Sequence, residues 1–426
     1  MGSYLSTKDF TILLGNVVDH FDTSLYIFLA PILAPLFFPH SDQIVALIMA
    51  YSILATSIIT RPIGTYIFGI IAQNHGPSLA LSYSLIGVGI GTLATGLLPD
   101  YQTIGFMAPA LLVALRMISG IFAAGECAIA KLYILHDKSE NEAFRGSYLY
   151  QTSSILGIAL ASLAVTIVHY LEINNAWRLC FIFGGIATFI GFFLRKASMV
   201  IEKKATEELI KFYSPRALHT LWKHKMDLIR IAIVTSFNHI TYVIPFVTMN
   251  HLIPMVTDIE IKTMMMLNSF MLVFDMLAIP FIGKITAGLN KQHIMVTASA
   301  VLTLTIIPIW YFIENSTLFY ISFVRLWIVI WGIVFLCPLN LWCRDQVMGN
   351  EKYIVVGIGT ALGASPIGKL SPAICLALYH TTGSYMTIAF YAASVFGLTL
   401  FVVTKRKVPS FISNSRPSSR GARSAT

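Results

Sequence analysis

The stretch TILLGNVVDHFDTSLYIFLAPILAPLFF, residues 11–38, decides what kind of protein this chain is. It is long and apolar enough to cross a lipid bilayer as one helix. Two carboxylates, Asp19 and Asp22, interrupt it three residues apart, so they lie on one face of that helix. Because a charged group in hydrocarbon is costly, such a pair marks by default a polar pathway inside a membrane protein.

The composition of the whole chain indicates many membrane spans. Of the 426 residues, 56% are apolar and 12% are charged, and the mean hydropathy is +0.74. One water-soluble core does not bury so much apolar surface, so the solvent is expected to be lipid. The five cysteines all fall in apolar segments without a pairing pattern, which indicates neither a disulfide framework nor a zinc site. The N-terminus lacks a basic region, so the first apolar run is expected to remain as a helix and not to be cleaved as a signal peptide.

Apolar stretches near 20 residues predict an all-α membrane protein with twelve transmembrane helices as two six-helix bundles. We expect helices at roughly 10–36, 45–71, 79–98, 104–135, 147–170, 177–195, 229–256, 263–286, 293–313, 317–342, 354–379 and 384–404. The corresponding domains are an N-terminal bundle over 1–195, a charged cytoplasmic linker over 196–227, a C-terminal bundle over 228–404 and a disordered basic tail over 405–426. Hydropathy alone leaves ten or eleven spans open.

The distribution of lysine and arginine predicts the topology, because these residues accumulate in cytoplasmic loops. The loops expected on one side are basic, and they include the central linker and the tail. The opposite loops carry mainly acids, among them Asp42, Asp100 and Glu172. Both termini are therefore expected in the cytoplasm. The net charge of +9 is then a topological signal, and it does not require nucleic acid as a partner.

The segment GNVVDHFDTSLY, residues 15–26, resembles the first-helix signature of the metabolite:proton symporter family, a branch of the major facilitators. That signature has Glu and Trp where this chain has Asp19 and His20. The resemblance continues in the first half through RPIG (61–64), Arg116 with GE (125–126), RG (145–146) and WR (177–178), and more loosely in the second half through Pro280, Gly283, Gly357, Gly363 and Pro366. It implies the major-facilitator fold and proton symport of a small polar metabolite.

The loop between the second and third helices departs from that family pattern. Major facilitators usually carry an Asp and an Arg there, and this chain has GIIAQNHGPS, residues 69–78, without either charge. Gly69 and Gly76 keep the tight turn, and Gln73 stands where the acid is usual. We assign Gly69, Gln73, Gly76 and Arg145 to the gating loops and expect gating without the usual ionic latch.

Three acids are candidates for proton coupling: Asp22, Asp19 and, second in preference, Glu126. At 1.5 Å per residue from residue 10, Asp19 lies about 13 Å and Asp22 about 18 Å into the membrane, near its middle. Their protonation would depend on whether Arg61 or Arg116 approaches, which is the property that a proton-coupled carrier needs. The alternative is that they are acids near the cytoplasmic surface.

The expected substrate-binding residues carry charge or hydrogen-bonding groups at membrane depth. They are Arg61, Arg116, Arg325, Tyr26, Asn238, Tyr242, Asp275 and Lys369. Arg61 has the alternative of a structural pair with an acid of the first helix, and Arg325 that of a pair with Asp275. Together with Lys131, the intramembrane charges comprise four acids and five bases, so one spare positive charge would suit a substrate carboxylate.

The residues and the resemblance together predict a proton-coupled importer of an amino acid, betaine-type osmolyte or organic acid that works by alternating access. A proton-driven exporter of the same fold, or a sensor without transport, remains the alternative. Enzyme activity is not expected, because the chain has no nucleophile elbow, phosphate loop or zinc-protease motif. We expect no cofactor, no metal and no nucleic acid partner. The protein is expected to be a monomer in a bacterial inner membrane, with protons, a small-molecule substrate and lipid as its partners.

Overall fold

The structure, a computed structural model, describes residues 7–405 except 136–137, 139, 172–174, 200–216, 315 and 348–351. This part of the chain is helical and contains no strand, which confirms the expected all-α fold. In the first half the helices are α1 (Thr7–Phe37), α2 (Gln43–Ser52), η1 (Ile53–Thr56), α3 (Ser57–His75), α4 (Pro77–Leu97), α5 (Tyr101–Ile104), α6 (Met107–Leu135), α7 (Glu140–Leu171) and α8 (Ala176–Met199). In the second half they are α9 (Ala217–Lys223), α10 (Lys225–Val243), η3 (Ile244–Thr248), α11 (Met249–Val256), α12 (Ile261–Thr286), α13 (Lys291–Tyr311), α14 (Leu318–Arg344), α15 (Lys352–Leu362), η4 (Gly363–Lys369), α16 (Ser371–Thr382) and α17 (Met386–Lys405).

Twelve spans in the described residues are long and apolar enough to cross a membrane, as the hydropathy predicts. Three of the spans are composite: α2, η1 and α3 form one, α10, η3 and α11 another, and α15, η4 and α16 a third. The expected linker and tail fall mostly on residues 200–216 and 406–426, which lie outside the described residues. Within the expected linker, α8 continues to Met199 and α9 forms a short helix.

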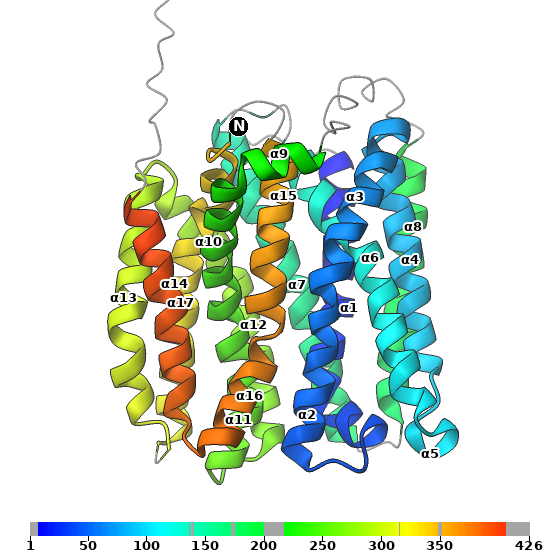
Figure 1. Ribbon diagram of the computed structural model, residues 1–426, viewed down its shortest axis with the longest axis vertical. Helices are drawn as coiled ribbons and strands as arrows, with labels where there is room; N and C mark the ends of the chain where they lie inside the picture. The colour runs from blue at the N-terminus through cyan, green and yellow to red at the C-terminus, as the bar shows by residue number, and fades with distance from the viewer. Residues whose placement is uncertain are drawn as a thin grey trace, which may run out of the picture.

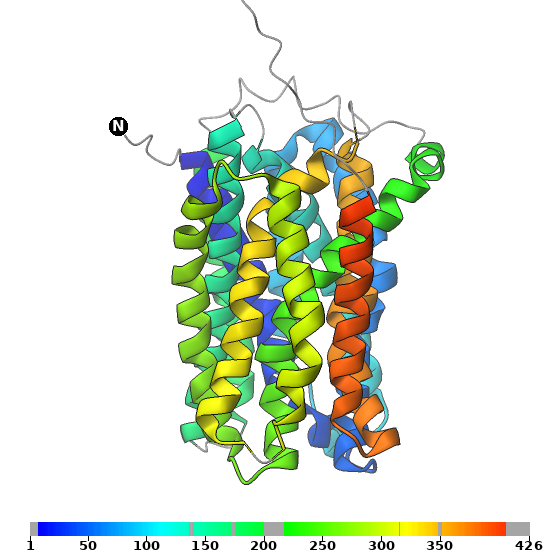
Figure 2. The same cartoon turned by 90° about the vertical axis from the view of Figure 1, so that its left-hand side faces the viewer.

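The spans run side by side along the long axis of the molecule, and the helices of the two halves occupy opposite sides of it (Figure 1). Helix α1 begins and α17 ends at the same end of the bundle, the top of Figure 1, which we call the terminal end. The short helices α2, α5, α11 and α16 lie at the opposite end. Figure 2 shows that α9, in green, projects sideways from the bundle at the terminal end.

Several basic side chains gather at the terminal end and pair there with acids. Lys138 contacts Asp9 at 2.8 Å between nitrogen and oxygen. Lys291 and Arg344 both contact Asp345, at 3.4 and 3.1 Å. These contacts join the ends of α1, α13 and α14 to neighbouring loops.

The three composite spans change helical type near the middle of the bundle. The turn η1 is a 3₁₀ helix, while η3 and η4 are π-helical turns that contain Pro245 and Pro366. Such turns expose backbone groups and often occur at functional sites. The spans that carry η3 and η4 contribute many lining residues to the cavity described below.

Small residues allow the helices of the first bundle to pack closely. A Cβ atom added at Gly157 of α7 would overlap the carbonyl oxygen of Val17 in α1, and one at Gly64 of α3 would overlap the carbonyl oxygen of Ile121 in α6. Close backbone approach of this kind is common between membrane helices. It fixes α1 against α7 and α3 against α6, and so positions Asp19 and Arg61, which project from α1 and α3.

Candidate functional site

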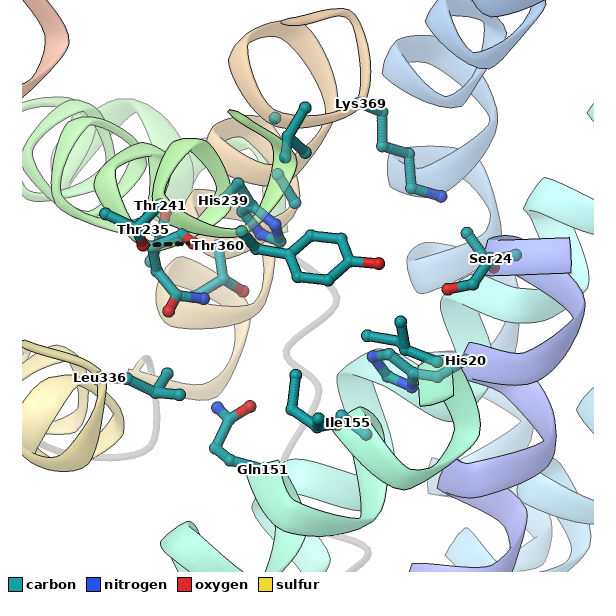
Figure 3. Close-up of a pocket in the computed structure, with 18 of the residues that line it drawn as sticks. His20, Ser24, Gln151, Ile155, Thr235, His239, Thr241, Leu336, Thr360 and Lys369 are labelled. Carbon is teal, nitrogen blue, oxygen red and sulfur yellow. Dashed lines mark hydrogen bonds between the residues drawn. The ribbon is translucent and has the colours of Figure 1, made fainter. Parts of the chain in front are cut away.

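A cavity of about 180 Å³ lies between the two bundles (Figure 3). One wall comes from α1, α3, α6 and α7, and the other from α10, η3, α12, α14, α15, η4 and α16. The polar and charged lining residues are Asp19, His20, Thr23, Ser24, Arg61, Thr65, Lys131, Gln151, Ser154, Thr235, Asn238, His239, Thr241, Tyr242, Asp275, Asn340, Thr360 and Lys369. In Figure 3, His20 and Ser24 lie on one side of the space and His239 lies across from them, while the side chain of Lys369 extends toward the side of Ser24 in this view.

The cavity occupies the middle of the bundle and extends toward the terminal end. On α7 its lining stops at Ile158, and on α14 it starts at Val329, each close to the midpoint of its helix. Asp19 lies about 18 Å along α1 from Thr7, in a helix about 46 Å long at 1.5 Å per residue. The acid is therefore far from either membrane surface. The alternative interpretation, in which Asp19 is a surface acid, does not fit this depth.

Asp19 projects into the cavity with incomplete hydrogen bonding. The residue is 3% exposed, and its Oδ1 has no hydrogen-bond partner among the described residues. Its Oδ2 lies 3.8 Å from Nδ1 of His20. Arg61 is the strongest electrostatic partner that stabilises its charge, and Lys369 of the second bundle acts in the same direction. A carboxylate with bases from both bundles nearby can respond to their relative movement.

The ring of His20 has a defined hydrogen-bonding role. Its Nδ1 lies 3.0 Å from the carbonyl oxygen of Asn16, and because a carbonyl only accepts, Nδ1 carries the proton in this contact. In the neutral ring Nε2 is then an acceptor. His239, across the cavity, lies within electrostatic range of His20, Lys131 and Arg61. The cavity therefore contains two imidazoles in addition to its charged groups.

Asp22, one turn along α1, lies in a different environment. Thr92 of α4 donates a hydrogen bond of 2.5 Å to its Oδ1, and Nη1 of Arg116 in α6 lies 3.5 Å from its Oδ2. Arg116 also donates to Thr95 at 2.6 Å, and its guanidinium lies 5.4 Å from the ring centre of Tyr26. These residues form a buried network inside the first bundle. Asp22, Tyr26 and Arg116 line a separate pocket of about 30 Å³, which Lys369 also borders.

The two charged residues expected in the second bundle, Asp275 and Arg325, lie in different places. Asp275 of α12 lines the cavity, but Arg325 of α14 does not, and it is fully buried. Nη2 of Arg325 donates a hydrogen bond of 2.5 Å to Oδ1 of Asn268, two helical turns from Asp275. Arg325 therefore lies outside the cavity lining, and among the described residues it forms no ion pair with Asp275. Sequence spacing fixes depth along a helix but does not fix which neighbour its faces meet.

The other predicted substrate-binding residues differ in whether they line the cavity. Asn238, Tyr242, Lys369 and Arg61 line the cavity. Tyr26 donates a hydrogen bond of 2.8 Å to the carbonyl of Ala50, which makes it a contact within the first bundle.

The third acid and the expected gating loops lie outside the main cavity. Glu126 is fully buried and does not line it. Among the gating residues, Gly69 is buried, Arg145 is exposed, and Gly76 adopts φ 91° between α3 and α4, a conformation that favours glycine. The backbone of Gln73 belongs to α3, and its side chain lies outside the described residues.

Several lining residues were not predicted from the sequence. Thr235 and His239 line the cavity from the helix that carries the predicted Tyr242, and the three residues have the spacing i, i+4 and i+7. This spacing marks one face of a helix, and a polar stripe in an apolar segment was the available signal. Gln151, Asn340 and Thr360 had no comparable signal, because isolated amides and hydroxyls are common in membrane helices.

A family model described as Major Facilitator Superfamily matches residues 12–366. The chain belongs to the Major Facilitator Superfamily. Its relatives include the alpha-ketoglutarate permease of Escherichia coli strain K12, 23% identical over 406 residues, which are 93% of this chain and 90% of the relative. The proline/betaine transporter of the same organism is 30% identical over 190 residues, which are 43% of this chain and 38% of that protein. The resemblance to metabolite transporters is thus confirmed, and the chain is a transporter and not an enzyme.

Among solved structures, this major facilitator is similar to the xylose transporter XylE from Escherichia coli in a partially occluded inward-open conformation. The TM-score is 0.71 at 13% identity, and the match covers 95% of this chain and 99% of that one. This likeness confirms the fold. The superfamily and the relatives make the chain a multi-pass membrane transporter of small metabolites.

Proposed function

We propose that this major facilitator is a proton-coupled symporter that imports a small polar metabolite bearing a carboxylate. Amino acids, betaine-type osmolytes and organic acids belong to this class. The observation that carries the proposal is the position of Asp19: a buried carboxylate at mid-membrane depth that faces the cavity between bundles, with Arg61 and Lys369 as basic neighbours. An intramembrane acid at a cavity wall is the common device of proton relays.

The charge balance of the cavity supports an anionic group on the substrate. Among the described residues its lining contains two carboxylates, Asp19 and Asp275, and three cations, Arg61, Lys131 and Lys369. When Asp19 is ionised, the lining has one positive charge in excess, and when it is protonated the excess is two. Binding of a proton therefore strengthens the attraction of the cavity for a carboxylate. Symport requires such positive coupling between proton binding and substrate binding.

The proposed mechanism is alternating access. The two bundles rock about the cavity, and substrate and proton are loaded from one side and released to the other. Arg61 belongs to the first bundle and Lys369 to the second, so a change in their separation alters the field at Asp19. Protonation then depends on conformation. Glu126 and Asp22, which are near enough to act electrostatically on Asp19, influence its charge as part of the same group.

We infer the location and the orientation of the protein from the distribution of its charges and from its relatives. The basic terminal end is placed in the cytoplasm of a bacterial cell, with the protein as a monomer in the inner membrane. We assign the bundles to 1–195 and 228–404, the charged linker to 196–227 and the basic tail to 405–426. The E. coli relatives with named metabolite substrates support this location.

A transport screen tests the proposal. Purified protein in liposomes is given an imposed pH gradient, acidic outside, and labelled amino acids, betaines and dicarboxylates are offered in turn. We expect one class to accumulate inside while the gradient collapses faster than in protein-free liposomes. Gradient-driven efflux of the same solutes would identify an exporter, and binding without flux would identify a sensor; either result contradicts the proposal.

A further inference from the structure

A second polar cluster lies beyond the cavity, on the side of the opposite end. Asn268 accepts the hydrogen bond from Arg325 and donates one of 3.1 Å to Ser162 of α7. The hydroxyls of Ser162 and Ser269 lie 2.9 Å apart, and those of Ser269 and Thr166 lie 3.1 Å apart. We call these five residues the distal seam. It joins α12 and α14 of the second bundle to α7 of the first.

The distal seam borders the cavity on that side. Ser162 follows the last lining residue of α7, Ile158, by one helical turn. Arg325 precedes the first lining residue of α14, Val329, by one turn. A solute that passes between the opposite end and the cavity along this interface therefore meets the seam first.

Arg325 is held in the seam with most of its hydrogen-bonding capacity unused. Its side chain is fully buried, and its Nε and Nη1 have no hydrogen-bond partner among the described residues. A guanidinium offers five N–H donors in a planar fork that matches a carboxylate. Burying such a group beside a single neutral amide is unfavourable, because its other N–H groups lose water without gaining a partner.

Toward the opposite end, the seam is followed by two histidines and a lysine. Ser162, Thr166 and His169 follow one another along one face of α7 at i, i+4 and i+7. His169 has Lys262 of α12 as an electrostatic neighbour, and His251 of α11 has His169 as one. His251 is buried, and neither of its ring nitrogens has a hydrogen-bond partner among the described residues.

We propose that Arg325 is a second carboxylate-binding site, which forms when the distal seam separates and the protein opens at the opposite end. In this structure Asn268 accepts a hydrogen bond from the guanidinium and is itself hydrogen-bonded to Ser162, so the guanidinium is kept away from solvent. When α7 moves away, the free N–H groups face the opened path and bind the carboxylate of an arriving solute. The solute then passes to Arg61 and Lys369 in the cavity. This inference rests on the proposed alternating access.

Charged thiol reagents test the site without a known substrate. In a chain freed of its five native cysteines, Ser269→Cys is exposed to anionic 2-sulfonatoethyl methanethiosulfonate or to the cationic 2-trimethylammonioethyl reagent. Each reagent is applied to right-side-out and to inside-out membrane vesicles. The rate of labelling by each reagent is divided by its rate of reaction with free cysteine. From the opposite end, we expect this corrected rate to be about tenfold higher for the anionic reagent than for the cationic one. Tenfold is at the lower end of the rate increases that a charged cleft produces by attracting an oppositely charged ligand.

Variants at Arg325 separate its charge from other effects. Arg325→Lys keeps the charge and should keep the preference for the anion, whereas Arg325→Gln should bring the ratio to that of free cysteine. Where Arg325→Gln fails to insert, Asn268→Asp in the chain with Arg325 neutralises the same charge and should have the same effect. An unchanged ratio in either neutralised variant overturns the proposal, as does absence of labelling from both faces.

The outcomes also separate this inference from the proposed function. Labelling needs neither a proton gradient nor a substrate. The ratio of labelling by the two reagents therefore measures the effect of the charge on Arg325 even if the protein does not couple transport to protons. If Ser269→Cys is labelled without any influence of Arg325, the second site is excluded and proton symport is unaffected. If the charge preference holds while the liposome screen shows no proton-driven uptake, the symport proposal fails alone.

Discussion

The two carboxylates of α1 lie one turn apart but occupy different environments. Asp19 faces the cavity, and one of its oxygens has no hydrogen-bond partner among the described residues. Asp22 faces into the first bundle, where Thr92 and Arg116 satisfy it. A partly satisfied group beside a cavity is suited to exchange protons, whereas a group in a closed network is suited to hold helices together. Three residues of sequence thus separate the proposed coupling site from a carboxylate that is bound within a network between helices.

The largest effect is expected for Asp19→Asn. The amide keeps the size of the side chain but cannot bind and release a proton in the transport cycle, so accumulation against a gradient should fall to the equilibrium level. Exchange of labelled for unlabelled solute across the membrane should continue. Uptake driven by an imposed pH gradient and solute counterflow in the same liposomes measure the two quantities. Accumulation equal to that of the unchanged protein would exclude Asp19 from coupling.

The second effect is expected for Asp22→Asn and concerns stability. Removing one partner of a buried pair leaves Arg116 uncompensated, at a cost of about 3–5 kcal/mol. The melting temperature of the purified protein should fall, and the double variant Asp22→Asn with Arg116→Met should recover part of the loss. If Asp22→Asn retains its stability but loses proton-driven accumulation, the assignments of the two acids must be exchanged.

The smallest of the three effects is expected for Lys369→Gln. This change removes one of the three cations that line the cavity among the described residues, and it should raise the KM for transport about tenfold, or about 1.4 kcal/mol. Lys369→Arg is the matched control and should stay close to the original KM. The same KM in Lys369→Gln and in the unchanged protein would show that this charge does not bind the substrate.

The contrast between the two acids also shows what the sequence can and cannot predict. Hydropathy predicted the twelve spans, because the length and polarity of each segment are local properties. Spacing placed both acids near the middle of the membrane. Nothing in the local sequence shows that Thr92 and Arg116, on two other helices, surround Asp22, so the sequence could not separate the environments of the two acids.

The same limit applies in the second bundle. Asp275 and Arg325 are both intramembrane charges, and the sequence left open whether they pair. The structure separates them, with Asp275 at the cavity and Arg325 in the distal seam. Which helices meet across a bundle interface is a tertiary property, and a single sequence does not encode it in any local pattern.

Proton uptake that accompanies the transported solute tests the central claim most directly. The solute found in the liposome screen is added to weakly buffered liposomes without an imposed gradient, and the external pH is followed. The account predicts alkalinisation for the unchanged protein and for stably folded Asp22→Asn, and none for Asp19→Asn, although all three bind the solute. Alkalinisation by Asp19→Asn equal to that of the unchanged protein would contradict the account.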